Sequence, residues 1–213
     1  MPNTRPYADD LDYLGDEARF LRIRTTRIET GKELRETNFT FETGGDVRTG
    51  AVSLQHRVTT LKQTEEDLRG VIEARRRVSS TGLGINRLCQ EHDLRDEERL
   101  LVVAACIPAL STQLADEVFG GSIGFFGGGL SVEELARLLA PASPREWAEA
   151  MKLLGPKATL IANSILGVDY TPSDSAAARE WNGSQVYPSG KTLALVTGQD
   201  DSPVVMPGNG TQH

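Results

Sequence analysis

Residues 94–110 read LRDEERLLVVAACIPAL and contain the longest apolar run of the chain. Acidic residues 96–98 come just before this run. Carboxylates are stabilising near the positive N-terminal end of a helix, so the segment predicts a helix over residues 95–109. Aromatic residues make up only 6% of the chain. Leu, Val, Ile and Ala side chains such as those of this run must therefore fill the core.

Short helices are predicted on both sides of this segment, over residues 85–91 and 112–119. Farther along, Ser131 and Ser143 are each followed three positions later by a glutamate. This is the capping-box pattern, and it predicts helices over residues 131–140 and 143–154. Residues 160–166 fit a strand or a last helical turn, and residues 193–197 (LALVT) fit a short strand. Short helices followed by weak strands are typical of a winged helix or another helix-turn-helix relative.

Two longer helices are predicted before this unit. Apolar positions spaced by three and four follow residues 8–36 and again residues 51–79, which places each set on one helix face. Glu65 is a polar break in the second set, and the Thr- and Gly-rich residues 37–50 predict a loop. This pattern favours an antiparallel helical hairpin. The alternative is an intermolecular coiled coil, for which the repeat is short and imperfect.

The predicted fold class is therefore mainly α. A long helical hairpin at residues 7–80 precedes a winged-helix-like α(+β) domain at residues 82–198, and a disordered tail follows at residues 199–213. A glycine-rich linker, GGSIGFFGGG, lies at residues 120–129 within the second unit.

The composition is that of an ordinary globular protein, with 38% hydrophobic and 25% charged residues. The apolar run at residues 100–110 is far shorter than the ~20 residues that span a bilayer, and the chain turns acidic too early for a signal peptide. We expect no membrane span and a cytoplasmic location. Cys89 and Cys106 are predicted to be small buried hydrophobic residues rather than a disulfide.

Two longer motifs resemble catalytic sequences but lack their context. Gly120-Gly-Ser-Ile-Gly124 matches a nucleophile elbow around Ser122, yet it follows a predicted helix instead of a strand. Ser189-Gly-Lys-Thr192 resembles the end of a phosphate-binding loop, but Gln185 replaces the first glycine. Pro188 and LALVT also argue against the strand and the helix that this loop needs.

Shorter patterns are incomplete as well. Gly82-Leu-Gly84 lacks the third glycine of a dinucleotide site, and Cys89 with His92 supplies only two of the four ligands of structural zinc. The acidic groups at residues 65–67 and 96–98 are interpreted as solvated helix faces. The sequence predicts no enzyme, no cofactor and no metal site.

Nucleic acid is not the expected partner. The net charge is −7, and an acidic chain is poorly suited to a phosphate backbone. The helix at residues 131–140, taken as the recognition helix, carries two glutamates and one arginine, and the helix at residues 143–154 is no richer in groups that read a major groove. Arg75, Arg76 and Arg77 are interpreted as cations at a helix C-terminus, with a phosphate-binding patch as the alternative.

Several segments resemble a bacterial group of AAA+ ATPases, some of which accompany contractile injection systems. They are Tyr7-Ala-Asp-Asp-Leu-Asp-Tyr-Leu-Gly-Asp-Glu17, residues 94–110, Gly128-Gly-Leu-Ser-Val-Glu-Glu-Leu135, Gly155-Pro-Lys-Ala-Thr-Leu160 and Leu193-Ala-Leu-Val-Thr-Gly198. The resemblance covers residues 7–198. It implies the helical and winged-helix-like region that precedes the ATPase module in that group. The chain carries no match to the catalytic residues of that module.

Three functions follow as hypotheses. The first is a non-catalytic interaction or accessory module that docks a protein partner, such as an AAA+ ATPase or a larger assembly. The second is a helix-turn-helix DNA-binding regulator, with residues 75–77 on the phosphates. The third is a structural component of an assembly such as a contractile injection system. Phe125 and Phe126, with the three arginines, are the predicted partner contacts.

Overall fold

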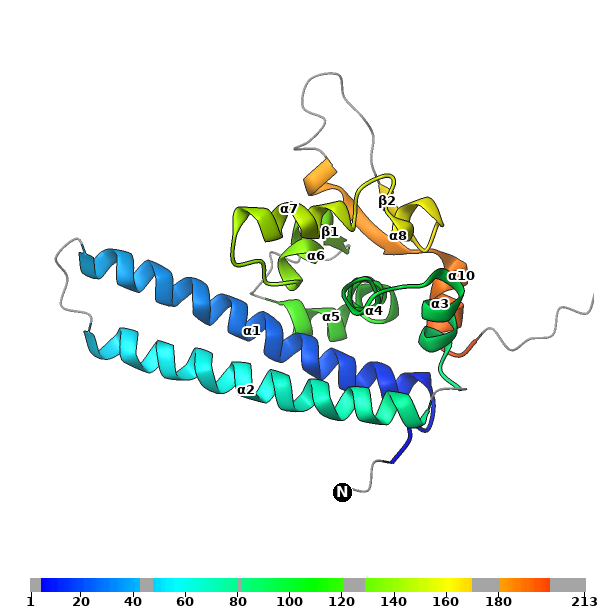
Figure 1. Cartoon of the computed structure of the whole chain (residues 1–213), viewed down its shortest axis with the longest axis horizontal. Helices are drawn as coiled ribbons and strands as arrows, with labels where there is room; N and C mark the ends of the chain where they lie inside the picture. Colours follow the sequence, from blue (N-terminus) through cyan, green and yellow to red (C-terminus); the bar gives the residue numbers. More distant parts are fainter. Residues whose placement is uncertain (1–4, 43–47, 80–81, 121–128, 170–180, 200–213) are drawn as a thin grey trace, which may run out of the picture.

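A computed structural model describes residues 5–42, 48–79, 82–120, 129–169 and 181–199 of the chain. Its longest elements are helices α1 (Asp10–Glu42) and α2 (Arg48–Val78). They lie antiparallel and side by side, and one end of the pair extends past the rest of the molecule (Figure 1). The predicted hairpin is present, but the expected loop at residues 37–50 is too long. Helix α1 continues to Glu42 and α2 begins at Arg48, so much of that Thr- and Gly-rich segment is helical.

Three shorter helices follow: α3 (Gly84–His92), α4 (Asp96–Leu110) and α5 (Thr112–Phe119). Helix α4 runs through the centre of the body, with helices on several sides (Figure 1). Residues 98–107 of α4 are all buried. A helix that is apolar all round belongs in a core, which explains why the run at residues 100–107 has no polar face.

The remaining elements build a small mixed unit. They are β1 (Leu130–Ser131), α6 (Val132–Leu138), α7 (Pro144–Lys152), α8 (Thr159–Ala162), β2 (Leu166–Asp169), β3 (Gln185–Pro188) and α10 (Gly190–Val196). The three strands form an antiparallel sheet in the order β1-β3-β2. Two helices followed by a β-hairpin that pairs with an earlier strand form the predicted winged-helix arrangement. The mainly helical fold class is confirmed.

Two strand predictions need correction. Residues 193–197 are not a strand, because they lie in and just after α10. Thr192, Leu195 and Val196 are its buried positions, and this spacing of three and four is helical. Residues 160–166 were predicted to form either a strand or a last helical turn, and both are present. Helix α8 occupies Thr159–Ala162, and β2 begins at Leu166.

The base of the hairpin and the body share one hydrophobic core. Tyr13, Phe20 and Leu21 of α1 are fully buried together with residues of α4, α5 and α6. Thr25 Oγ1 donates to the carbonyl of Val118 at 2.9 Å and so links α1 to α5 in the body. We call residues 10–27 with 65–78 the base, and residues 28–42 with 48–64 the arm.

Candidate interaction surface

The helix-turn-helix is made by α6 and α7, and each helix begins at a serine cap. Ser131 Oγ accepts the Glu134 N–H, and Glu134 in turn accepts the Ser131 N–H at 2.6 Å. Ser143 Oγ accepts the Glu146 N–H, whereas the Glu146 carboxylate accepts the Ala142 N–H at 2.7 Å. Both predicted helix starts are confirmed, and both glutamates are occupied by backbone groups.

The second helix of such a motif is the one that reads DNA. Here that helix is α7, because β2 and β3 follow it in the sheet. Taking residues 131–140 as the recognition helix was therefore wrong. The exposed charged side chains of α7 are Arg145, Glu146, Glu149 and Lys152. The helix therefore carries two cations and two carboxylates, and it has no surplus positive charge.

One of the cations of α7 is also paired directly. Lys152 Nζ lies 2.7 Å from Glu149 Oε1, and both side chains are mostly exposed. The hydrogen bond and charge of Lys152, together with nearby Arg145, lower the pKa of the Glu149 carboxyl. The paired lysine is less available to a DNA phosphate than an isolated one.

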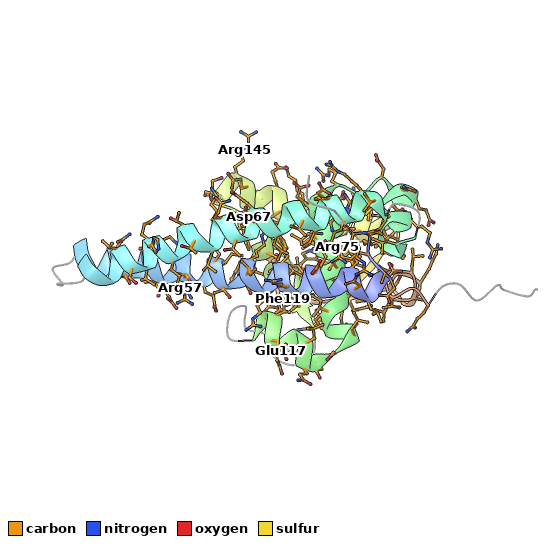
Figure 2. The ribbon with its side chains drawn as sticks, turned by 90° about the horizontal axis from the view of Figure 1, so that it is seen from below. Arg57, Asp67, Arg75, Glu117, Phe119 and Arg145 are labelled. Carbon is orange, nitrogen blue, oxygen red and sulfur yellow. The ribbon has the colours of Figure 1, made fainter. Side chains whose placement is uncertain are left out.

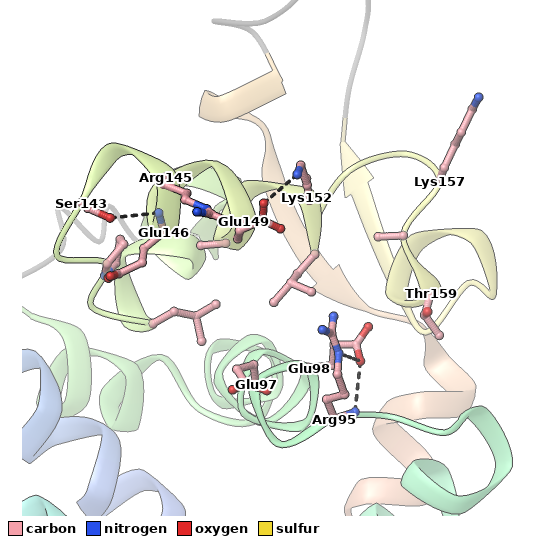
Figure 3. A pocket seen from close by; sticks show the side chains of 15 residues that line it. Arg95, Glu97, Glu98, Ser143, Arg145, Glu146, Glu149, Lys152, Lys157 and Thr159 are labelled. Carbon is pink, nitrogen blue, oxygen red and sulfur yellow. Dashed lines mark hydrogen bonds and ion pairs between the residues drawn. The ribbon is translucent and has the colours of Figure 1, made fainter.

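A pocket of about 780 Å³ lies between the start of α4, helix α7 and the segment leading into α8. This volume is within the usual range for ligand sites. Figure 3 shows α4 nearly end-on below the pocket and α7 above it. Apolar groups that line it include Leu139, Pro141, Ala150 and Leu153.

Arg95 is the polar group set most clearly into this pocket. Its Nε lies 3.3 Å from Glu98 Oε2, and Figure 3 shows its guanidinium directed toward the space between α4 and α7. The Arg95 side chain is 65% exposed, whereas Glu98 is only 6% exposed. Glu98 also accepts the Arg95 N–H at 3.0 Å. The interpretation of residues 96–98 as a solvated face is therefore wrong for Glu98, which fixes the start of α4.

The three predicted arginines at the end of α2 have different environments. Arg75 binds Asp12 at 2.8 Å and Asp16 at 2.6 Å, and its guanidinium stacks on Tyr7. Arg76 binds Glu73 at 2.8 Å and donates to the Asn86 side chain. Arg77 is exposed. Figure 2 shows Arg75 near the end of the hairpin that lies against the body.

A buried ionic cluster joins the hairpin base to α4. Arg99 Nη1 donates to Glu17 and Tyr13, and Nη2 donates to Glu73 at 3.0 Å. Arg99 and Glu17 are 3% and 2% exposed. Burial alone would lower the pKa of Arg99, but Tyr13, Glu17 and Glu73 raise it. Burial and Glu17 also raise the pKa of Tyr13, so the cluster stays a fixed ion pair with a neutral phenol.

A second cluster lies where the hairpin leaves the body. Glu65 binds Arg24 at 2.9 Å and Arg27 at 2.6 Å. Glu65 is buried, so it is neither solvated nor a break in the packing. Burial lowers the pKa of Arg24, and Glu65 opposes that shift.

The cysteines show no sign of a reactive or metal-binding role. Both are free thiols, Cys106 buried and Cys89 partly so. Burial raises the pKa of Cys106 to about 12 and also raises that of Cys89. A thiol is nucleophilic only when ionised. Across the described part of the chain, no three His, Cys, Asp or Glu side chains are placed to hold a metal ion.

The segment from Ser189 to Thr192 has more of a phosphate-loop context than the sequence indicated. Strand β3 precedes it and α10 follows it. The prediction that both elements are absent was therefore wrong. Gln185 nevertheless lies within β3, where it pairs with Ser131 and Asp169. Ser189 caps α10, and its hydroxyl contacts buried Thr192 at 2.9 Å. The strand passes directly into the helix, without the glycine-rich loop that would surround a phosphate.

Ser122, Phe125 and Phe126 lie outside the described residues, so their predicted roles stay predictions. Sequence reasoning missed Arg95, Glu98 and Arg99 as structural partners. For Glu98 a signal was available, because a side chain three positions into a helix start can reach back to the first backbone N–H. Arg99 gave no such signal, because its partners Glu17 and Glu73 lie on α1 and α2.

Among the described helices, none is both long enough and apolar enough to cross a membrane. No curated protein and no solved structure matches the chain. One family model does match, described as "Winged helix domain, variant", and it spans residues 1–202. That match covers nearly all of the chain and agrees with the helix-turn-helix and sheet described above. The chain thus belongs to the variant winged helix domain family.

Proposed function

We propose that this chain is a non-catalytic protein-interaction module that docks a partner or helps a larger complex assemble. Winged helix domains can bind DNA or proteins, so the surface must decide between the two. The observation that carries the proposal is the charge of α7. The helix that would enter a major groove has equal numbers of cations and carboxylates.

The predicted arginine patch at residues 75–77 does not support a DNA surface either. Arg75 and Arg76 are engaged by acidic side chains of the hairpin and its neighbours. Arg77 is the exposed member of the group. Non-specific DNA binding depends on several phosphate contacts, and one exposed arginine at this place supplies little of that.

The hairpin supports the same proposal. The arm extends beyond the body (Figure 1), and its inner positions 34, 54, 58 and 61 are only half-buried. A projecting helical pair offers a long surface for another protein. We propose residues 7–80 as the part that reaches a partner and residues 82–198 as the part that anchors it.

The resemblance to the N-terminal region of certain AAA+ ATPases suggests the partner. We propose an AAA+ ATPase, or an assembly that contains one, as the protein that this module docks. The resembling segments at residues 7–17 and 94–110 meet in space, since Glu17 binds Arg99. This contact shows that both segments belong to one packed unit, and it leaves the identity of the partner to experiment.

Affinity purification of the tagged chain from its native host, with mass spectrometry, tests the proposal. We expect reproducible recovery of an ATPase or of assembly proteins that resists nuclease treatment. Recovery of DNA that is lost on nuclease treatment would support the regulator instead, as would salt-dependent binding to duplex DNA. A strictly monomeric chain that recovers no protein would contradict the proposal.

A further inference from the structure

The pocket beside α7 combines an apolar lining with a guanidinium that is only partly used. Leu139, Ala150 and Leu153 contribute apolar surface. Among the described residues, the Arg95 side chain makes a hydrogen bond through its Nε alone, to Glu98. Its two terminal nitrogens are directed into the same space (Figure 3). A planar guanidinium can bind a carboxylate with two parallel hydrogen bonds.

The hydrogen-bonding groups around the pocket favour an acidic occupant. Four carboxylates line it, and three of them already accept a hydrogen bond: Glu98 from Arg95, Glu146 from the Ala142 N–H, and Glu149 from Lys152. Four cations also line it, so the lining as a whole has no net charge. The two terminal nitrogens of Arg95 are donors that no described acceptor uses, and one carboxylate can bind both.

A nucleic acid would meet this pocket less well than a protein segment. A duplex presents regularly spaced phosphates, and a lining with equal numbers of cations and carboxylates offers such a polyanion no net attraction. A discrete carboxylate on a peptide can approach Arg95 while its apolar neighbour contacts Leu139 and Leu153. Interfaces of this kind place an apolar anchor in a pocket with charged groups at the rim.

We infer that this pocket binds an acidic segment of a partner protein, in which an Asp or Glu lies next to a large aliphatic side chain. The carboxylate binds the terminal nitrogens of Arg95, and Arg145 on α7 supplies a second cation at the rim (Figure 3). This inference rests on the proposed interaction role and specifies the chemistry of the partner.

Selection from a random peptide library displayed on phage tests the inference, because random peptides serve as probes whichever protein the native partner is. The full chain is the target, and the same selection is repeated with Arg95→Gln and with Arg145→Glu. Lys191→Glu on α10 is the matched control for Arg145→Glu, because it makes the same charge change at an exposed position that does not line the pocket. Circular dichroism checks that each variant is folded.

We expect the wild-type chain and Lys191→Glu to enrich peptides that pair a carboxylate with Leu, Ile or Val. Fluorescence anisotropy of an enriched peptide should show binding weakened about tenfold or more by Arg95→Gln and severalfold by Arg145→Glu, and weakened by added salt. Replacing the carboxylate of the peptide by its amide should have an effect similar to Arg95→Gln.

Three outcomes would overturn the inference. They are enrichment of basic or uncharged peptides, equal binding by Arg95→Gln, and duplex DNA that competes for the pocket. The affinity purification separates this failure from that of the proposed function. A native partner recovered equally by wild type and Arg95→Gln rejects the pocket while retaining the interaction role. Absence of both peptides and partners rejects both.

Discussion

The base and the arm of the hairpin use the same two helices in different ways. In the base, Tyr13, Phe20 and Leu21 are buried against the body, and Arg99 joins α1, α2 and α4. In the arm, the inner side chains of Leu34, Leu54, Val58 and Leu61 are only half-buried. The same helical pair is therefore part of the core at one end and projects from the body at the other (Figure 1). The change occurs near Thr25, whose hydroxyl donates to the Val118 carbonyl, and near Glu65, which binds Arg24 across the hairpin.

The largest predicted effect concerns the base. Arg99→Ala leaves Glu17 buried without its main partner, and breaking a buried pair in this way costs about 3–5 kcal/mol. Urea denaturation of the two chains measures the loss. A matched change to Arg27→Ala, whose side chain is 20% exposed, should cost clearly less. Equal losses would show that the ion cluster at the outer end of the base contributes as much to stability as the fully buried cluster around Arg99.

A pair of identical substitutions on α1 compares packing in the two regions. Leu21→Ala removes a fully buried side chain and should cost about 2–5 kcal/mol, as in other cores. Leu34→Ala, in the half-buried seam of the arm, should cost about 1 kcal/mol because less apolar area is lost. Thermal denaturation of both variants checks the order. A larger loss from Leu34→Ala would show that the arm is packed more tightly than its exposure indicates.

The sequence predicted the helical hairpin, the serine caps and the overall class because these depend on local signals. Spacing of three and four marks a helix face wherever one face is buried. The pattern at residues 193–197 failed because LALV is apolar throughout, and only the buried set Thr192, Leu195 and Val196 reveals the helical period. Strand β1 has only two residues, and its pairing with β3 depends on a segment more than fifty positions away.

The ion clusters could be predicted least. Glu65 was taken as a polar break, because nothing near it in sequence shows that Arg24 and Arg27 face it from another helix. The candidate pocket could not be predicted for the same reason. Arg95, Leu139 and Leu153 come from three elements, so their common space follows from the tertiary arrangement and from no motif. Arg75, Arg76 and Arg77 show the converse, because they are adjacent in sequence but differ in their partners and exposure in the fold.

Alkaline pH offers a third comparison, because groups with strongly raised pKa values belong to the base and the core. Burial raises the pKa of Cys106 from 9.0 to about 12. The folded state therefore holds the thiol neutral while the unfolded chain ionises. The stability from this group is complete below pH 9 and is lost as the pH rises toward 12, by at most about 1.4 kcal/mol per pH unit.

Urea midpoints measured from pH 8 upward test this expectation, with Cys106→Ala as the control. The variant should be less stable at pH 8 but lose less stability per pH unit above pH 9. Tyr13, whose pKa is also raised, adds a similar loss above its ordinary value of 10.0 in both proteins. Identical slopes for the two chains would contradict the assignment of the thiol to a buried, neutral state.

The smallest effect is expected from an ion pair on the outside of the arm. Lys62 lies 3.9 Å from Glu66, and both side chains are more than half exposed. Exposed pairs of this kind contribute about 0–0.5 kcal/mol, so Lys62→Ala should leave the urea midpoint almost unchanged, and added salt should remove any difference. Glu65 is the immediate neighbour of Glu66 but turns toward Arg24 and Arg27, so Glu65→Ala on the same helix turn should be markedly destabilising. If Lys62→Ala were the more harmful change, the charges that hold the hairpin together would lie on its outer face, and the inward cluster at Glu65 would not mark the boundary between base and arm.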